Sequence, residues 1–412
     1  DAFAALRYRD FSIVTLNQFC LTLAILIQEI IVAYSLYKIT KDPLTLGLIG
    51  LAEAIPYIAL SLWGGYFADR FNKQTIMKIC LFFAIPLPLV LWGLFHAYGL
   101  KQIELSTLSW GVYAVIFGLG TIRGFYNPSA TSLKPFLIPR EIYANGATRT
   151  TIGWQSGVII GPMLGGLMLA FLGRETSFIS VAVLLSLCFL LVNLLSKRTF
   201  PKIETERVLQ SLGEGFRFIA KTKIVPWAIS LDLVSVLFGG VIALLPIFAE
   251  DILKIGPEGL GYLRAAPSIG ALITMIALTR FPPTRHAWRN MLLAVAGFGL
   301  FTLLFAYSDY LWLSLFALAM TGACDSISVV IRQTILQIYP PENMRGRVAA
   351  VNGMFVSSSN ELGAFESGLA AKYLGPVIAT VFGGSMTLLV IALSWAKTKD
   401  LFGVDITQAE QK

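Results

Sequence analysis

The chain has 412 residues, of which 56% are hydrophobic and only 14% are charged. Soluble globular domains contain about 45–50% apolar and about 25% charged residues, so an ordinary soluble protein is excluded. The composition also excludes a disordered chain, a collagen and a disulfide scaffold, and a mean hydropathy of +0.72 indicates many membrane-spanning helices. The first apolar segment is too long for a cleavable signal peptide.

Twelve apolar segments follow one another along the chain, each near the length of about 20 residues that a helix needs to cross a bilayer. They are continuous runs, unlike the alternating segments of an outer-membrane barrel. We therefore expect an all-α membrane protein of twelve transmembrane helices. These helices are expected to begin near Phe11, Leu44, Thr75, Ser109, Gly146, Thr176, Ile224, Gly259, Ala287, Asp309, Val348 and Gly375.

The longest polar stretch divides the chain almost in half and predicts two pseudo-symmetric six-helix bundles. The expected domains are residues 1–195 for the first bundle, 196–223 for a cytoplasmic linker, 224–398 for the second bundle and 399–412 for a cytoplasmic tail. Within the linker, Leu209, Leu212, Phe216 and Ile219 recur at helical spacing, which is typical of an amphipathic helix at a membrane surface. A short, partly ordered loop is the alternative.

Lysine and arginine are distributed unequally between the two sides of the predicted membrane. With the N-terminus inside, 23 of the 32 basic residues fall on the inside, six fall on the outside and three lie within helices. Cytoplasmic segments of membrane proteins carry such an excess, so we expect both termini to be cytoplasmic. The net charge of +8 is then explained by the basic residues of the cytoplasmic segments. No nucleic-acid partner is expected.

The two predicted bundles also resemble each other in sequence. Residues 50–56 (GLAEAIP) in the second helix match residues 261–267 (GYLRAAP) in the eighth, and residues 139–141 (PRE) match residues 340–342 (PPE). Weak internal symmetry of this kind is typical of secondary transporters built from repeats.

The connection between the second and third helices contains the sequence GYFADRFNKQ at residues 65–74. It resembles the G-x-x-x-D-R-x-G-[RK] motif of the major facilitator superfamily, with Gly65, Asp69, Arg70 and Lys73 at motif positions. The glycine pair at 64–65 is expected to allow close helix packing, and Asp69 is expected to pair with a base or to cap the next helix. Asn72 stands where the family has a second glycine, and asparagine tolerates a left-handed turn.

The fifth predicted helix carries Gly157, Gly161 and Gly165 at four-residue spacing, with Pro162 among them. Small residues at this spacing form a smooth face that another helix can approach closely, and the proline allows a bend. The pattern is similar to the glycine-rich fifth-helix motif of antiporters in the same superfamily. That resemblance implies antiport, and simple helix packing is the other interpretation.

Further segments narrow the resemblance over essentially the whole chain. Residues 5–11, 263–271, 341–348 and 358–368 look like the branch that contains the enterobactin exporter and macrolide-efflux-type pumps. This resemblance implies a siderophore or drug:proton antiporter in the bacterial cytoplasmic (inner) membrane. The expected partners are a small-molecule cargo, protons and the lipid bilayer. A proton gradient would supply the energy without a cofactor or metal, and a monomer is expected.

Charged residues inside the predicted helices are candidates for a functional or structural role, because placing a charged side chain at the bilayer centre costs on the order of 2.5–3.5 kcal/mol of free energy. In the fold that the resemblance implies, the first, fourth, seventh and tenth helices line the central cavity. The candidates for proton coupling or cargo contact are therefore Glu29, Arg123, Asp232, Asp325 and Arg332. Carboxylates are the expected proton carriers, and a fixed ion pair between helices is the alternative role for each residue.

Four other charged residues lie on helices that border the interface of the two bundles in the implied fold. They are Glu53, Arg264, Glu361 and Glu366. Glu53 and Arg264 occupy equivalent positions of opposite charge in the two halves, so we expect them in a gate. Two acids that approach each other would share a proton, and hydration near the membrane surface is the alternative. Arg123 is also expected to meet Asp69 near an inner gate.

Together these features predict a secondary active transporter that exports a small amphipathic molecule by proton antiport and alternating access. An importer, a facilitator or a lipid flippase on the same fold is the first alternative, and a membrane sensor without transport is an alternative of another class. An enzyme is not expected, because the sequence has no Ser-His-acid set, metal-ligand cluster or phosphate-binding glycine loop. Aromatic candidates for cargo contact are Phe19, Trp154, Phe238 and Tyr262.

Overall fold

The computed structural model describes residues 4–196, 208–222, 224–281, 283 and 285–403, and every regular element in this part of the chain is a helix. The first seven are α1 (Arg9–Thr40), α2 (Leu44–Arg70), α3 (Lys73–Ala84), α4 (Pro86–Gly99), α5 (Leu105–Leu133), α6 (Tyr143–Phe171) and α7 (Gly173–Asn193). They are followed by α8 (Val208–Lys221), α9 (Ile224–Phe238), α10 (Val241–Ile247), α11 (Gly256–Arg280), α12 (Ala287–Ala306), α13 (Leu311–Ile338), α14 (Glu342–Leu374) and α15 (Pro376–Lys397). The prediction of an all-α protein is confirmed.

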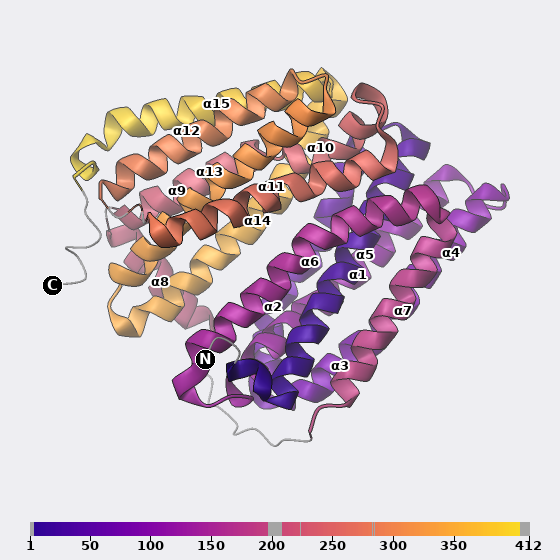
Figure 1. The fold of residues 1–412 in the computed structure, drawn as a ribbon, viewed down its shortest axis with the longest axis horizontal. Coiled ribbons are helices and arrows are strands. Elements are labelled where there is room, and N and C mark those ends of the chain that lie inside the picture. The colour runs from indigo at the N-terminus through magenta and orange to yellow at the C-terminus, as the bar shows by residue number, and fades with distance from the viewer. Residues whose placement is uncertain (1–3, 197–207, 223, 282, 284, 404–412) are drawn as a thin grey trace. The chain divides into compact units, whose positions relative to one another are not determined.

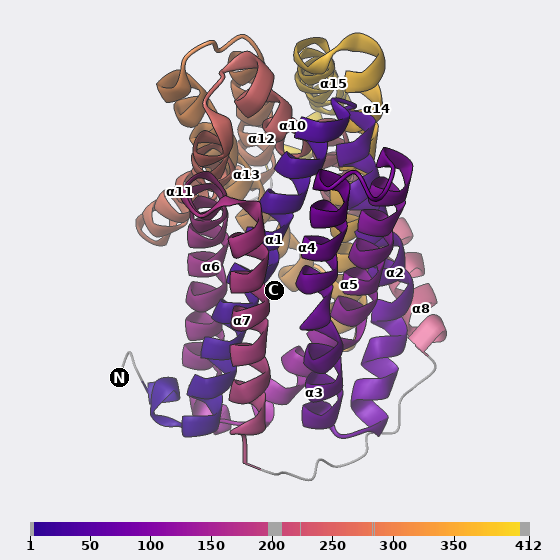
Figure 2. The ribbon, with the colours of Figure 1, turned by 90° about the vertical axis from the view of Figure 1, so that its right-hand side faces the viewer.

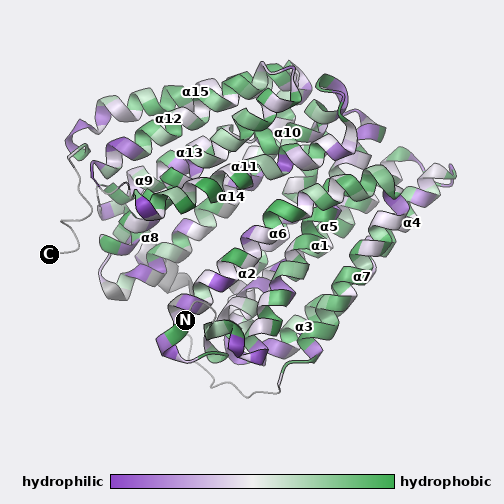
Figure 3. Ribbon diagram, viewed as in Figure 1, coloured by the Kyte–Doolittle hydropathy of each residue, from purple (hydrophilic) through white to green (hydrophobic). Residues whose placement is uncertain are grey.

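Eleven helical stretches of the described residues are long and apolar enough to cross a membrane. Three of these stretches consist of more than one element. Lys73–Gly99 contains α3 and α4, and Leu105–Phe136 contains α5 and a 3₁₀-helix (Lys134–Phe136). Ile224–Ile252 contains α9, α10 and a π-helix (Phe248–Ile252). The helix at the predicted eleventh span, α14, has 33 residues but is too polar to count among the eleven. Figure 3 shows hydrophobic residues along most of the other long helices.

The chain forms two compact units. The first consists of Asp1–Lys41, Leu51–Thr205 and Gly256–Ala265. In this unit α1 packs against α6 and α7, while α3 and α4 pack against α5 and α7. Figures 1 and 2 show α1, α6 and α7 running side by side.

The second unit consists of Asp42–Gly50, Glu206–Ile255 and Ala266–Lys412. Here α12 packs against α13 and α15, and α14 packs against α8, α9, α10 and α15. Its core is rich in large apolar side chains, of which Trp288, Phe248 and Phe305 are fully buried.

These units differ from the predicted bundles by two short segments. The start of α2, up to residue 50, belongs to the second unit, and the start of α11, up to residue 265, belongs to the first. Glycines make both contacts close. A β-carbon at Gly47 would lie 3.0 Å from the Cα of Phe365 on α14, and one at Gly261 would lie 2.7 Å from the carbonyl oxygen of Pro162 on α6. The first turns of α2 therefore belong to the second unit, and the first turns of α11 belong to the first unit.

The helix predicted in the linker is present as α8, and it packs against α14. Glu214 forms an ion pair with Arg347, and the rings of Phe216 and Phe355 meet edge to face with their centroids 5.6 Å apart. Gly215 allows the backbones to approach, because a β-carbon there would lie 2.9 Å from the carbonyl oxygen of Arg347. The preceding part of the linker, residues 197–207, and the end of the tail, residues 404–412, lie outside the described residues.

Candidate functional site

The predicted loop motif lies where α2 meets α3. Asn72 has φ −66° and ψ 116°, and its side-chain oxygen accepts hydrogen bonds from the backbone N–H groups of Gln74 and Thr75 at 2.9 and 3.3 Å. It is therefore the N-cap of α3. Asn72 does not adopt the left-handed conformation that asparagine tolerates, and the cap of α3 comes from Asn72 and not from Asp69.

The lysine of the motif is buried although it is charged. Lys73 is 1% exposed, and its ammonium group donates a 2.8 Å hydrogen bond to the carbonyl oxygen of Ala68. Asp69 lies close enough to interact electrostatically with Lys73. Arg70 is exposed, and its guanidinium lies 4.5 Å from the ring centre of Tyr66. Lys73 thus ties the start of α3 to the end of α2 and fixes the loop between them.

The two adjacent glycines before this loop have different surroundings. Gly64 faces α5, since a β-carbon there would collide with the carbonyl oxygen of Gly124. Gly65 faces open space, with nothing within 4 Å of the equivalent position. Close packing of α2 on α5 therefore depends on Gly64, and the expectation that Gly65 contributes to it is wrong.

The glycine-rich face predicted in the fifth span lies on α6 and packs against α1. A β-carbon at Gly157 or Gly161 would lie 2.9 Å from a side chain of α1, and one at Gly165 would lie 3.1 Å from its backbone. Pro162 lies inside α6, and its carbonyl oxygen faces Gly261 of α11. The small residues thus let α6 approach α1 and the start of α11 at the same level.

Glu29 of α1 and Arg264 of α11 form an ion pair in the first unit. Their side chains are 36% and 14% exposed, so the pair is partly shielded from solvent. The sequence assigned Glu29 to a cavity and Arg264 to a gate, and the structure brings the two together. The reason is the exchanged start of α11, which carries Arg264 into the first unit.

Glu53 of α2 forms an ion pair with Arg123 of α5, also in the first unit. The guanidinium of Arg123 lies 5.5 Å from the ring centre of Tyr57, one turn after Glu53. The expectation that Arg123 meets Asp69 is wrong for a packing reason. The helices touch at Gly120, where a β-carbon would collide with the carbonyl oxygen of Glu53, and this contact sets the next turn of α5 beside Glu53.

An ion pair in the second unit is almost completely buried. Arg332 of α13 and Asp232 of α9 have side chains that are 4% and 6% exposed. Removing one partner of such a pair leaves an uncompensated charge, which costs several kcal/mol. The sequence identified both residues as cavity candidates but did not indicate that they form a pair.

Asp325 lies on α13, two helical turns before Arg332. Its carboxylate forms no ion pair or hydrogen bond in the described part of the chain. The turn before it packs tightly on α11, because a β-carbon at Gly322 would collide with the carbonyl oxygen of Pro267. Asp325 is therefore a half-buried acid on a rigidly packed helix.

Glu361 and Glu366 lie on α14 in the second unit. A β-carbon at Gly50 would lie 3.1 Å from the carboxylate of Glu361, so Glu361 lies against the start of α2. Glu366 accepts a 3.4 Å hydrogen bond from the hydroxyl of Ser367. That hydroxyl lies against Gly240, at the break between α9 and α10. Glu366 is thus the sequence neighbour of Ser367, the residue that lies against the break in the seventh span.

Two polar residues of α1 have buried contacts that the sequence does not reveal. Asn17 is fully buried, accepts a hydrogen bond from the hydroxyl of Tyr126 and donates one of 2.7 Å to the carbonyl oxygen of Cys188. Gln18 accepts a hydrogen bond from the ammonium group of Lys134. Two adjacent polar residues within an apolar helix were the available signal, but the partners lie more than 100 residues away in the chain.

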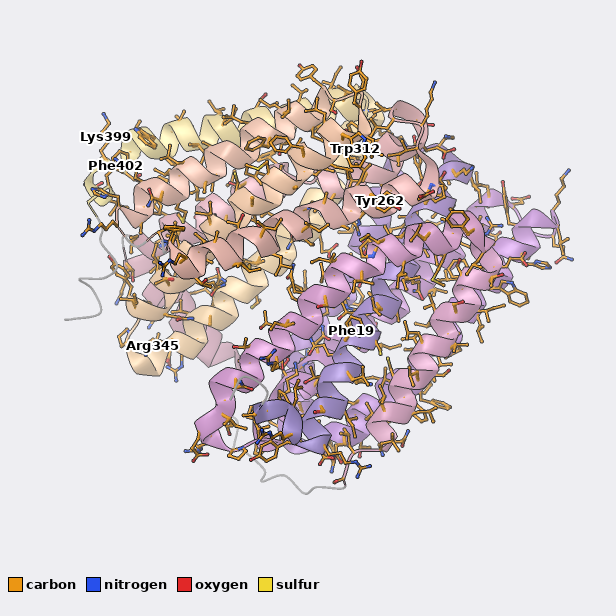
Figure 4. The ribbon with its side chains drawn as sticks, viewed as in Figure 1. Phe19, Tyr262, Trp312, Arg345, Lys399 and Phe402 are labelled. Carbon is orange, nitrogen blue, oxygen red and sulfur yellow. The ribbon has the colours of Figure 1, made fainter. Side chains whose placement is uncertain are left out.

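The aromatic candidates for cargo contact are spread over both units. Phe19 lies on α1 and Tyr262 on α11 in the first unit (Figure 4). The hydroxyl of Tyr262 donates a 3.3 Å hydrogen bond to Glu258. Trp154 of α6 is 45% exposed, and Phe238 belongs to the second unit. No group of three or more His, Cys, Asp or Glu side chains among the described residues could hold a metal ion.

Comparison with known proteins places this architecture in a family. Residues 14–364 match the family model of the Major Facilitator Superfamily. Multidrug efflux pump Tap from Mycolicibacterium fortuitum is 25% identical over 365 residues, which cover 84% of this chain and 85% of Tap. Enterobactin exporter EntS from Escherichia coli (strain SMS-3-5 / SECEC) is 25% identical over 354 residues, which cover 79% of this chain and 77% of EntS.

Solved structures of transporters share the fold. The nucleoside transporter NupG superposes with a TM-score of 0.71, over 95% of this chain and 98% of NupG, at 15% identity. The D-xylose-proton symporter gives a TM-score of 0.68 over 94% of this chain and 97% of its own, at 13% identity, so the likeness concerns the fold alone. The chain belongs to the major facilitator superfamily, and it is a multi-pass membrane transporter and not an enzyme.

Proposed function

We propose that this transporter exports a small amphipathic molecule across a bacterial cytoplasmic membrane by proton antiport. Two relatives support the direction, since one is named a multidrug efflux pump and the other an enterobactin exporter. The glycine-rich face of α6 supports antiport through its similarity to the antiporter motif. The excess of basic residues in one set of connections supports an orientation with both termini in the cytoplasm.

The observation that carries the proposal is that the three arginines inside the predicted spans, Arg123, Arg264 and Arg332, each form an ion pair with a carboxylate. The pairs are Glu29 with Arg264, Glu53 with Arg123, and Asp232 with Arg332. Protonation of a carboxylate removes its attraction for the base, so a proton changes the free energy of the helix contact that the pair maintains. A change of this kind at a contact between helices can shift the populations of two conformations.

Asp325 is the first candidate for the proton carrier. Unlike the paired acids, it can take up a proton without leaving a buried base uncompensated, and it lies two turns from the pair of Arg332 with Asp232. In the proposed cycle, a proton from outside binds the carboxylate of Asp325 or of Asp232 while cargo leaves. Release of the proton to the cytoplasm then allows the next cargo molecule to bind. The proton gradient supplies the energy, and one chain completes the cycle as a monomer.

Proton movement in proteoliposomes tests this proposal. Catechol-type siderophores or amphipathic cations added to vesicles with an internal pH-sensitive dye are expected to cause a proton flux in the opposite direction. Asp325→Asn is expected to abolish the cargo-driven flux while cargo binding is retained. The matched control is Asp309→Asn, which makes the same change at an exposed acid before α13 and should leave the flux unchanged.

Two results would reject the proposal. If Asp325→Asn transports protons at the wild-type rate, this residue is not the carrier. If cargo equilibrates across the bilayer and the wild-type protein moves no protons, a facilitator or a lipid flippase replaces the antiporter.

Exchanging the charges of Glu29 and Arg264 tests whether their pairing matters for transport. Arg264→Glu places two carboxylates together and is expected to lower the initial rate of cargo efflux by about tenfold, equivalent to about 1.4 kcal/mol. The double variant Glu29→Arg/Arg264→Glu restores opposite charges and should recover most of the rate. Efflux is measured in cells that hold equal amounts of each variant in the membrane. An equal loss in the single and double variants would show that the pair itself is not required.

A further inference from the structure

A cavity of about 410 Å³ lies in the first unit at the end of α1. The last turns of α1 contribute Tyr34, Ser35 and Lys38 to its wall. Arg174, at the start of α7, and Pro257, at the start of α11, complete the polar end of the cavity. None of these residues was among the candidates for cargo or proton contact.

Two basic side chains give this cavity a positive charge. The guanidinium of Arg174 lies 4.7 Å from the ring centre of Phe95, and the ammonium group of Lys38 lies 5.5 Å from that of Tyr34. Arg174 forms no ion pair in the described part of the chain, and its Nε is buried there without a hydrogen-bond partner. A guanidinium stacked on a ring keeps the N–H groups at its edge for an oxygen ligand. Nε is enclosed, so only the terminal N–H groups of Arg174 can bind an anion in the cavity.

The acids nearest in sequence to the cavity wall are engaged elsewhere. Glu175, next to Arg174, is 2.8 Å from Nδ1 of His96. Glu258, next to Pro257, accepts a hydrogen bond of 3.3 Å from the hydroxyl of Tyr262. Glu175 also lies close enough to Arg174 to interact with it electrostatically, although the two side chains form no ion pair, so it offsets only part of the positive charge of Arg174.

The hydroxyl of Ser35 is an independent sign of a ligand. Ser35 is only 5% exposed and lines the cavity, yet its hydroxyl has no hydrogen bond to any described residue. Other hydroxyls of α1 bond to the carbonyl four residues earlier, as Thr22 and Thr40 do at 2.8 and 2.9 Å. The hydroxyl oxygen is not one of the fully enclosed atoms without a partner among the described residues, so it is open to the cavity, where it can form a hydrogen bond to an oxygen ligand.

Two helices also begin at this cavity. Gly173, with φ 77°, starts α7, and Gly256, with φ 66°, starts α11, so a residue without a side chain allows each sharp turn. The N-terminal ends of helices carry partial positive charge and favour anions. Their charge adds to that of Arg174 and Lys38 in the same volume.

We propose that this cavity binds an oxyanion of the phosphate class, with Arg174 and Ser35 as ligands and Lys38 adding attraction. A cavity of this volume accommodates inorganic phosphate as well as the glycerophosphate headgroup of an anionic lipid. In the orientation proposed above, the end of α1 lies at the outward-facing surface of the cytoplasmic membrane. Inorganic phosphate and lipid headgroups can both reach this surface.

The thermal unfolding of the purified, delipidated full chain in detergent tests the proposal. The probes are dihexanoyl phosphatidylglycerol, dihexanoyl phosphatidylcholine and sodium phosphate, compared at equal ionic strength. A ligand that binds only the folded protein raises its Tm. We expect a saturable rise of a few degrees with the phosphatidylglycerol and none with the phosphatidylcholine. A rise with phosphate as well assigns the site to free oxyanions, and its absence assigns the site to the lipid headgroup.

Three variants attribute the effect to this cavity. Arg174→Gln and Ser35→Ala are each expected to lose most of the rise in Tm. The control, Lys101→Gln, removes one charge from an exposed lysine after α4 and should keep the full rise. Ser35→Ala removes only one oxygen, so it remains informative if Arg174→Gln does not fold. A Tm that no anionic probe raises, or an undiminished rise in Ser35→Ala, would overturn the proposal.

Discussion

Arg332→Leu is expected to destabilise the protein by about 3–5 kcal/mol and to abolish transport. The substitution leaves Asp232, which is 6% exposed, without its counter-charge in an apolar interior. The loss is measured as a fall in Tm of the purified protein in detergent, and transport is measured in proteoliposomes of the same preparation.

Two controls separate the buried charge from the loss of an arginine. The double variant Asp232→Leu/Arg332→Leu removes both charges and should recover most of the stability, because two packed apolar side chains replace the pair, while transport stays lost. Lys372→Gln breaks the exposed pair with Asp42, whose atoms are 3.0 Å apart, and should cost no more than about 1 kcal/mol. A double variant as unstable as Arg332→Leu would contradict this account of the pair.

Gly64→Ala is expected to disrupt the first unit, whereas Gly65→Ala is expected to be tolerated. A β-carbon at Gly64 would collide with the carbonyl oxygen of Gly124, a backbone atom that cannot turn away as a side chain can. Overpacking of this kind costs about 1–3 kcal/mol, and more where the backbone must move. At Gly65 nothing lies within 4 Å, and alanine is favoured over glycine in a helix by about 1 kcal/mol.

The comparison uses the Tm and the initial rate of transport of the two variants. Gly64→Ala should lower both, and Gly65→Ala should leave the Tm unchanged or slightly raised. Because the two glycines are adjacent in one motif, the pair of variants distinguishes packing from a requirement for glycine in the motif itself. Equal loss in both variants would show that helix packing is not the reason for the effect.

Most of the fold could be predicted from the sequence, because a transmembrane helix depends on local composition. Continuous apolar stretches located eleven of the spans, and the spacing of apolar residues after residue 208 located α8. The exchange of the first turns of α2 and α11 between the units could not be predicted. It depends on where glycines of one helix meet the backbone of another, as Gly261 meets Pro162.

The candidate site could be predicted as a set of residues but not as a set of contacts. Each charged residue within a span is conspicuous because it is costly there. The partner of Arg123 is Glu53, 70 residues earlier in the chain. The two side chains meet because α2 packs on α5 at Gly120. The same limit applies to Asn72. Its side chain could support either a turn or a helix cap, and only the path of the backbone decides for the cap.

Cargo accumulation against its own gradient tests the central claim, proton-coupled antiport, most directly. Proteoliposomes that are acidic inside, with the membrane potential clamped by valinomycin and equal potassium, are given a labelled amphipathic cargo outside. Antiport predicts that protons leaving the vesicles drive the cargo inward beyond equilibrium, and that a protonophore abolishes the accumulation. Cargo that reaches the same level with and without the pH gradient would contradict proton coupling.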